Sequence, residues 1–74
     1  MQITIKLFAT FRSGRFTSET RNYPDGTTVA RIIEDLRIPE QELGIVLVNS
    51  RHVPLPHQLA DGDALSLFPL LGGG

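Results

Sequence analysis

The sequence has no cysteine, and among its 74 residues only one is lysine, Lys6. The absence of cysteine excludes disulfide bonds, thiolate metal ligands and sulfur chemistry on a side chain, and it favours a cytoplasmic protein over a secreted one. The net charge is also small: 7 basic and 8 acidic residues give −1 at pH 7, so no basic surface attracts nucleic acid or an anionic membrane. We therefore expect a cytoplasmic protein that binds neither nucleic acid nor membrane and is monomeric when free.

Long hydrophobic runs and internal linkers are absent as well. No apolar stretch approaches the roughly 20 residues that span a bilayer, and no repeat or low-complexity segment interrupts the chain. A chain of this length forms one small domain, close to the size at which a core becomes hard to stabilise. We expect a compact body over residues 1–68 and a flexible C-terminal tail over residues 69–74.

Two strands are predicted in the first third of the chain. Apolar and polar residues alternate over residues 2–8, with Ile3, Ile5 and Leu7 on one side, which is the period of a half-buried strand. Residues 16–23 follow a turn and are rich in Phe, Thr and Tyr, so we expect them to form the second strand of a hairpin.

One helix is predicted next. Either Thr27 or Thr28 can accept a hydrogen bond from the free amides at its start. Its apolar stripe has the spacing i, i+3, i+4 and i+7 and consists of Val29, Ile32, Ile33 and Leu36. We expect the helix to end near Ile38, because Pro39 disfavours helical geometry in the residue before it.

The second half of the chain predicts three more strands. Residues 45–48 form a short, continuous apolar run, typical of a strand buried on both faces at the centre of a sheet. Asn49 and Ser50 favour a tight reversal into a short strand at residues 51–53, and a last strand covers residues 64–68. This order predicts an α+β fold in which one helix packs on one face of a mixed sheet, with the first and last strands as its parallel central pair.

The end of the chain is the most informative segment. Residues 64–74 have no charged side chain, and they contain an apolar collar followed directly by three glycines. The collar consists of Phe68, Pro69, Leu70 and Leu71, and the glycines are Gly72, Gly73 and Gly74. Glycine has no Cβ, so such a run can enter a narrow site of another protein and present its terminal carboxylate there, while an exposed apolar collar marks a docking surface. A frayed terminus or a cloning remnant would also produce terminal glycines, but neither explains the apolar strand that precedes them.

Other polar residues have simpler interpretations. His52 and His57 lack a third ligand at metal spacing, so we expect no metal site. Asp61 and Asp63 flank a turn glycine, which favours turn chemistry over paired-carboxylate catalysis. Arg12 can pair with a partner's carboxylate, but a solvated arginine is the more frequent state. We expect no catalytic constellation within the chain.

In their order and spacing, five segments resemble the ubiquitin-like sulfur carriers MoaD and ThiS, which have the β-grasp fold. The segments are KLFATFR at 6–12, the helix after Thr27, Thr28 and Val29, VLVN at 46–49, LADGD at 59–63 and LFPLLGGG at 67–74. Family members commonly end in two glycines and have Asn-Gly after the central strand, whereas this chain ends in three and has Asn-Ser. Its opening and its Phe-Pro pair look more like MoaD, and its compact middle looks more like ThiS.

The resemblance implies that an E1-like adenylyltransferase of the MoeB or ThiF type uses MgATP to adenylate the carboxylate of Gly74. A sulfur donor then displaces AMP and leaves a thiocarboxylate, which a MoaE-type subunit or a thiazole synthase uses to make molybdopterin or the thiamine thiazole. Gly72 and Gly73 would be the thin stalk, and the collar would dock. The sequence agrees with activation in trans, because it has no phosphate-cradling glycine loop followed by lysine. We thus expect a protein-borne sulfur donor without a bound cofactor, not an enzyme by itself, although it could be the small subunit of a molybdopterin synthase.

Two alternatives stay open. In the first, the activated glycine forms an isopeptide with a target lysine, so the chain is a protein modifier. Because Lys6 is its only lysine, self-conjugated chains of varied linkage are not expected. In the second, the chain is a non-catalytic β-grasp interaction module with an inert tail.

Overall fold

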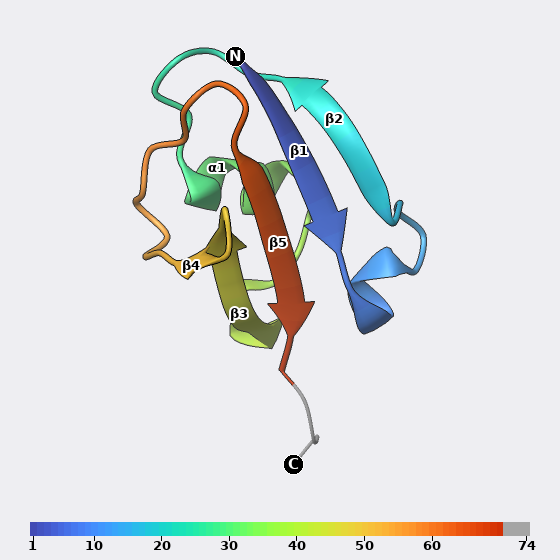
Figure 1. The fold of residues 1–74 in the computed structure, drawn as a ribbon. Coiled ribbons are helices and arrows are strands. Elements are labelled where there is room, and N and C mark those ends of the chain that lie inside the picture. Colours follow the sequence, from blue (N-terminus) through green and yellow to red (C-terminus); the bar gives the residue numbers. More distant parts are fainter. Residues whose placement is uncertain (71–74) are drawn as a thin grey trace.

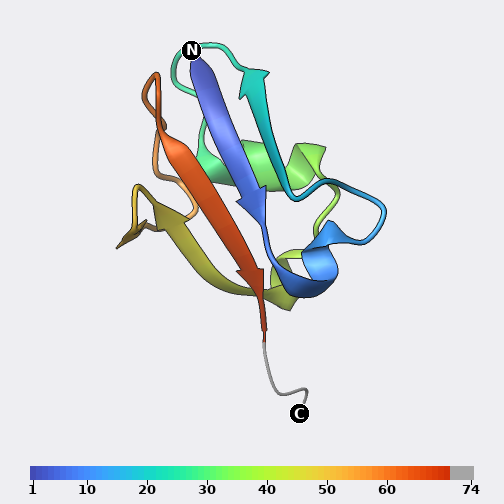
Figure 2. The same ribbon diagram turned by 45° about the vertical axis from the view of Figure 1, so that its right-hand side comes forward.

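The computed structural model describes residues 1–70, which form a mixed sheet with one α-helix packed on one face (Figures 1 and 2). Its strands are β1 (Gln2–Leu7), β2 (Ser18–Asn22), β3 (Leu43–Val48), β4 (Arg51–His52) and β5 (Ala64–Pro69). The helix is α1 (Val29–Asp35), and two 3-10 turns are η1 (Ala9–Arg12) and η2 (Glu40–Glu42). The strand order across the sheet is β2-β1-β5-β3-β4. The predicted α+β architecture is confirmed.

The first and last strands lie side by side at the centre of the sheet, as predicted. β1 and β5 run parallel, with Ile5 opposite Leu65 and Leu7 opposite Leu67. All four side chains are fully buried, because the alternation of a strand points them to the face that α1 covers. The parallel direction also places the end of β5 beside the end of β1, so the chain leaves the sheet next to η1 (Figure 1).

The core lies between the sheet and α1. Its buried apolar residues within the described chain are Ile3, Ile5, Leu7, Phe11, Val29, Ile32, Ile33, Leu36, Ile38, Val48, Leu59, Leu65 and Leu67. The whole apolar stripe predicted for the helix is among them. Since burying one Ile or Leu side chain is worth about 1.5–3 kcal/mol, this cluster supplies the main force that holds the helix on the sheet.

The apolar run at residues 45–48 does not lie at the centre of the sheet, so that prediction was wrong. The run belongs to β3, which lies between β5 and β4, and Val48 is its only buried member. Ile45 keeps 41% of its surface exposed. The helix covers one face only, so alternate side chains of β3 face solvent despite their apolar character. β4 also ends at His52, one residue earlier than predicted.

Local signals in the sequence identified most of the turns correctly. The predicted hairpin forms between β1 and β2, although β2 is shorter than residues 16–23. The Thr28 hydroxyl caps α1 by accepting a hydrogen bond from the Arg31 N–H at 3.2 Å. Asn49 and Ser50 both have positive φ, 51° and 69°, which is the geometry of a tight type I′ hairpin turn.

The helix ends earlier than the sequence predicted. Its last residue is Asp35, three residues before Ile38. Arg37 adopts a left-handed backbone with φ 57°, and its N–H donates to the Glu34 carbonyl at 3.0 Å while the Ile38 N–H donates to the Ile33 carbonyl at 3.2 Å. This is the Schellman pattern, so the helix ends at this motif, before it reaches Pro39.

None of the helices in residues 1–70 has the length and apolar character of a membrane-spanning segment.

Arg15 strengthens this helix end from outside. Its Nε donates to the Leu36 carbonyl at 3.0 Å, and its two terminal nitrogens donate to the carbonyls of Phe11 and Arg37, each at 3.2 Å. The carbonyls at a helix C-terminus lack intrahelical donors and carry partial negative charge, so a guanidinium is a favourable partner for them. The side chain thus fastens η1 to the end of α1.

Replacing Arg15 with Met is therefore expected to lower the free energy of unfolding by about 1–2 kcal/mol, since hydrogen bonds from a charged donor are lost and partly solvated carbonyls remain. Urea unfolding followed by circular dichroism measures the change. Arg51→Met, on the exposed β4, is the matched control and should shift the midpoint by less than about 0.5 kcal/mol. Equal midpoints for the Arg15 variant and the wild type would contradict a capping role.

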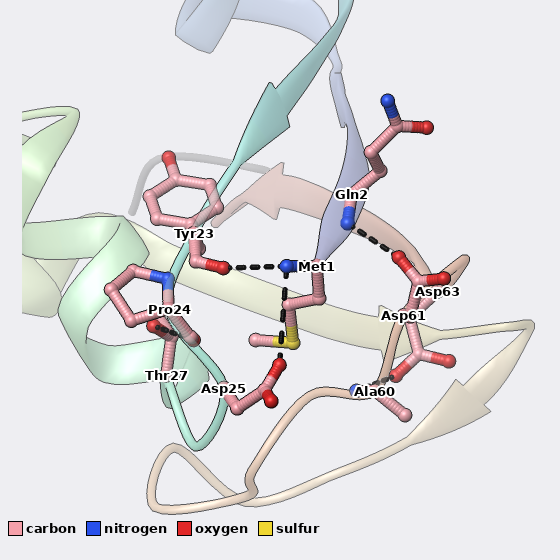
Figure 3. A network of polar contacts seen from close by, with 9 residues as sticks. All are labelled: Met1, Gln2, Tyr23, Pro24, Asp25, Thr27, Ala60, Asp61 and Asp63. Carbon is pink, nitrogen blue, oxygen red and sulfur yellow. Dashed lines mark hydrogen bonds and ion pairs between the residues drawn. The ribbon is translucent and has the colours of Figure 1, made fainter.

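Asp61 and Asp63 hold the turn before β5, as their spacing predicted (Figure 3). The Gln2 N–H donates to Asp61 Oδ1 at 2.6 Å, and the Ala60 N–H donates to Asp63 Oδ2 at 2.8 Å. Asp63 Oδ1 accepts a further hydrogen bond from Asn49 Nδ2 at 2.9 Å. Both carboxylates are thus occupied with backbone and turn partners, and the interpretation as turn residues is confirmed.

Candidate functional site

The candidate site is the root of the C-terminal tail, where β5 ends. β5 continues to Pro69, one residue beyond the predicted strand end. Leu70 follows it and is 62% exposed. The remaining predicted site residues, Leu71, Gly72, Gly73 and Gly74, lie outside the described residues.

Alternation along β5 divides the collar between the two faces of the sheet. Pro69 is buried on the same face as Leu67, whereas Phe68 points to the open face and is half-buried. Within the described part of the collar, Phe68 and Leu70 therefore offer contact surface to a partner, and Pro69 supports the strand from the core side.

Phe68 is part of a larger apolar surface. Its ring stacks on that of Phe8, with ring centroids 4.1 Å apart and planes inclined by 8°. Ile45 lies opposite Phe68 in the β3–β5 register, so its side chain is on the same face. We call Phe8, Ile45 and Phe68 the aromatic patch. Exposed apolar groups gathered on an otherwise polar monomer mark an interaction surface, and this one borders the point where the tail begins.

Arg12 takes part in this surface instead of being simply solvated, although its side chain remains exposed. Its Nε donates to the Leu7 carbonyl at 2.8 Å, and its guanidinium carbon lies 5.5 Å from the centroid of the Phe8 ring. A cation over an aromatic face is attracted to the ring. The arginine thus helps to fix Phe8 and adds a positive charge to the edge of the aromatic patch.

Sequence reasoning missed Phe8 and Ile45 as site residues. The signal for Phe8 was available, because a parallel pairing of the first and last strands places the residue after Leu7 beside the residue after Leu67. Ile45 was assigned to the core because its neighbours in β3 are also apolar.

The other polar candidates lie apart from the tail root. His52 and His57 belong to no group of three or more potential ligands that could hold a metal ion within residues 1–70. The pKa of Arg21 is raised by its hydrogen bond to Glu19, but Arg21 pairs with Ile3 at the opposite end of β1 from Phe8. Two surface hollows have volumes of about 300 and 530 Å³, and the larger one is lined in part by His57. Neither is lined by a residue of the collar or of the aromatic patch.

Comparison with known proteins shows the family to which this sequence belongs. The sequence model of the ThiS family matches residues 5–74, which include the collar and the glycines. The chain belongs to the ThiS family. The resemblance to ThiS and MoaD sulfur carriers is thereby confirmed.

Solved structures agree with this ThiS-family assignment. The Haloferax volcanii HVO 2177 protein is 30% identical, with a TM-score of 0.81 over 100% of this chain and 87% of that one. A Pyrococcus furiosus protein described as molybdopterin converting factor subunit 1 is 27% identical, with a TM-score of 0.78 over 93% and 97% of the two chains. SAMP1 of Haloferax volcanii is 24% identical, with a TM-score of 0.78 over both full chains, and supports the ubiquitin-like β-grasp fold. Comparison with curated proteins finds no match.

Proposed function

We propose that this ThiS-family chain is a sulfur carrier whose reacting group is the α-carboxylate of Gly74. The observation that carries the proposal is the family match, which continues through the apolar collar to the last glycine. The tail root adds support, because the partly exposed aromatic patch includes Phe68 of β5, the strand from which the tail emerges. One face of the domain can thus hold a partner while the tail enters the partner's active site.

The proposed chemistry has two steps. The Gly74 carboxylate attacks the α-phosphate of MgATP in an E1-like enzyme, which gives an acyl-adenylate and pyrophosphate. Hydrosulfide, or the terminal sulfur of a persulfide, then attacks the acyl carbon and AMP leaves. Hydrosulfide gives the thiocarboxylate directly, whereas a persulfide gives an acyl disulfide that a thiol must reduce. The chain contains no cysteine, so it has no thiol side chain that could react with the activated acyl group.

The proposed partners are an E1-like adenylyltransferase of the MoeB or ThiF type and a synthase that accepts the sulfur for molybdopterin or the thiamine thiazole. In this scheme ATP and magnesium are bound by the activating enzyme, and the carrier is its substrate. The name of the Pyrococcus neighbour, subunit 1 of a converting factor, supports a synthase subunit as the second partner.

The test is to incubate the chain with the E1-like adenylyltransferase encoded in the same genome, MgATP and sulfide, and to measure the intact mass. Replacement of one oxygen by sulfur in the C-terminal peptide is the expected result. Covalent adducts on lysines of other proteins would instead favour a protein modifier, the function suggested by the name of another Haloferax volcanii structure with the same fold, small archaeal modifier protein 1. An unchanged mass without pyrophosphate release would favour the inert interaction module and overturn the proposal.

Docking should depend on the leucines of the collar. Ordering the tail costs about 1–2 kcal/mol per residue, and fully burying one Leu side chain returns about 1.5–3 kcal/mol. Leu70 is 62% exposed in the free chain, so much of its surface is available for this. Replacing Leu70 and Leu71 with Ala is expected to weaken partner binding at least about tenfold in a calorimetric titration, while the free energy of unfolding changes by less than about 0.5 kcal/mol. Equal affinity of the wild type and the double variant would count against the collar as a docking surface.

A further inference from the structure

We propose that Gly44 is a positioning residue: because it has no side chain, the peptide bond between Pro69 and Leu70 can lie against β3 and be held by the η2 carbonyl, and this fixes where the tail leaves the domain. The inference rests on the proposed function, because it concerns how the carboxylate of Gly74 reaches a partner's active site.

The first observation is a bulge in β3 opposite the end of β5. Leu43 pairs with Pro69 and Ile45 pairs with Phe68, so Gly44 is an extra residue that faces no partner of its own. A bulge bends the strand that contains it. Here the bulge lies opposite Phe68 and Pro69, the last two residues of β5.

The second observation is the closeness of the two backbones. A Cβ on Gly44 would lie 2.6 Å from the Pro69 carbonyl oxygen, 2.9 Å from the Pro69 carbonyl carbon and 3.0 Å from the Leu70 nitrogen. All three are backbone atoms, so they cannot rotate away as the end of a side chain can. The φ of Gly44 is not in the left-handed region, so glycine is required here by space and not by backbone conformation.

The third observation is a hydrogen bond on the same peptide unit. The Leu70 N–H donates to the Glu42 carbonyl at 2.9 Å, and Glu42 is itself fixed by a 2.9 Å hydrogen bond from its N–H to the Pro39 carbonyl. The peptide bond between Pro69 and Leu70 is therefore held by the η2 carbonyl and lies against the bare α-carbon of the bulge. We call this arrangement the root clamp, formed by Glu42, Gly44, Pro69 and Leu70.

The root clamp is expected to set how far the Gly74 carboxylate can reach from the domain. Four residues follow Leu70, and an extended segment of four residues reaches at most about 14 Å. If the clamp opened, the last paired residue would be Phe68 and six residues would follow it. The effective concentration of a tethered group falls roughly as the −3/2 power of tether length, so about a twofold loss comes from length alone, and the loss of direction adds to it.

The clamp and the aromatic patch also share two strands, β3 and β5. Ile45 of the patch directly follows Gly44, and Phe68 directly precedes Pro69. A partner docked on the patch therefore meets a tail that starts at a fixed place relative to its own surface. A variant that opens the clamp but keeps the patch and the Leu70 side chain should therefore change docking little and slow the reaction of the carboxylate.

The experiment compares wild type and Gly44→Ala as full chains, with the E1-like adenylyltransferase of the same genome and pyrophosphate release as the assay. We expect kcat to fall at least about fivefold and KM for the carrier to stay within about twofold, because the patch is unchanged. Hydrogen exchange by NMR should show that the Leu70 amide exchanges at least tenfold faster, while the amides of Leu47 and Ser66, which are register partners beyond the bulge, keep their protection.

Two controls separate positioning from general destabilisation. Thr28→Ala removes the cap of α1 and weakens the fold without touching the tail root, and Gln41→Ala alters an exposed neighbour of the clamp. Both should keep kcat within about twofold of wild type. A Gly44→Ala chain with the same kcat as Thr28→Ala, or with a protected Leu70 amide, would overturn the positioning role.

If Gly44→Ala does not fold, a second pair of variants tests the positioning role of the root clamp. Leu70→Ala and Leu70→Pro lose the same leucine side chain, but only proline also removes the N–H that donates to Glu42. We expect kcat of Leu70→Pro to be at least about fivefold below that of Leu70→Ala, and equal values would overturn the inference. A wild-type chain that releases no pyrophosphate would overturn the proposed function instead, while the exchange of the Leu70 amide reports on the clamp separately.

Discussion

Deleting Gly73 and Gly74 is expected to reduce the rate of adenylation at least about 100-fold, since a misplacement of only about 1 Å at a reacting atom can cost that much. The deletion draws the terminal carboxylate back by up to about 7 Å along the chain. The core described for the chain lies within residues 1–70, so the unfolding midpoint should remain close to that of the wild type. Pyrophosphate release with the E1-like enzyme, at a carrier concentration well above KM, measures the effect.

A variant of unchanged length separates the reach of the tail from its width. Gly73→Ala keeps the carboxylate at the same distance and adds one Cβ to the stalk, so we expect a smaller loss than for the deletion. If the deleted chain formed thiocarboxylate as fast as the wild type, the terminal carboxylate would not be the reacting group. If Gly73→Ala matched the wild type, the partner's channel would not require a bare backbone.

The parts of the fold that sequence predicted are those set by neighbours along the chain. The alternation at Ile3, Ile5 and Leu7 and the stripe of α1 each reflect the period of one element, and both are in the core. The Thr28 cap and the reversal at Asn49 likewise depend on residues within a few positions of each other. Such signals are complete within a short window, so one sequence is enough to interpret them.

The features that were missed depend on contacts between distant segments. The bulge at Gly44 arises from the register of β3 against β5, and the residues next to Gly44 in the sequence do not predict it. Arg15 lies just before residues 16–23 in the sequence, but its role comes from the carbonyls of Leu36 and Arg37, more than twenty positions away. The end of α1 was placed too late because proline was taken as the stop signal, although Arg37 had already closed the helix in a left-handed conformation.

The wrong prediction for residues 45–48 also bears on function. The apolar character of residues 45–48 suggested burial on both faces, yet Ile45 stays 41% exposed beside Phe68. An apolar residue is expected to be buried, so one that stays on the solvent-exposed face of a sheet departs from the expected pattern. Such departures are expected at functional sites. Ile45 therefore supports the aromatic patch as a surface that a partner covers.

The second large effect is expected from Phe8. Phe8→Ala removes one ring of the stack and leaves the Phe68 ring without its partner at 4.1 Å, so the centre of the aromatic patch is lost. Truncating a central aromatic residue of an interface typically costs 2 kcal/mol or more, so we expect KM for the E1-like enzyme to rise by about 30-fold with kcat nearly unchanged. Steady-state kinetics over a range of carrier concentrations measures both.

Phe16→Ala is the matched control, because Phe16 is also half-buried but packs against the core and lies under Arg21, 5.1 Å from its guanidinium carbon. Both variants lose a partly buried ring, so they should lose similar folding stability, whereas KM should change by less than about twofold for Phe16→Ala. In the Phe8→Ala, Phe68→Ala double variant, the two losses should not add, because the stacked rings contribute a coupling of about 0.5–1.5 kcal/mol. Equal KM for the Phe8 and Phe16 variants would place the docking surface elsewhere on the domain, and additive losses would mean that the two rings contact the partner independently.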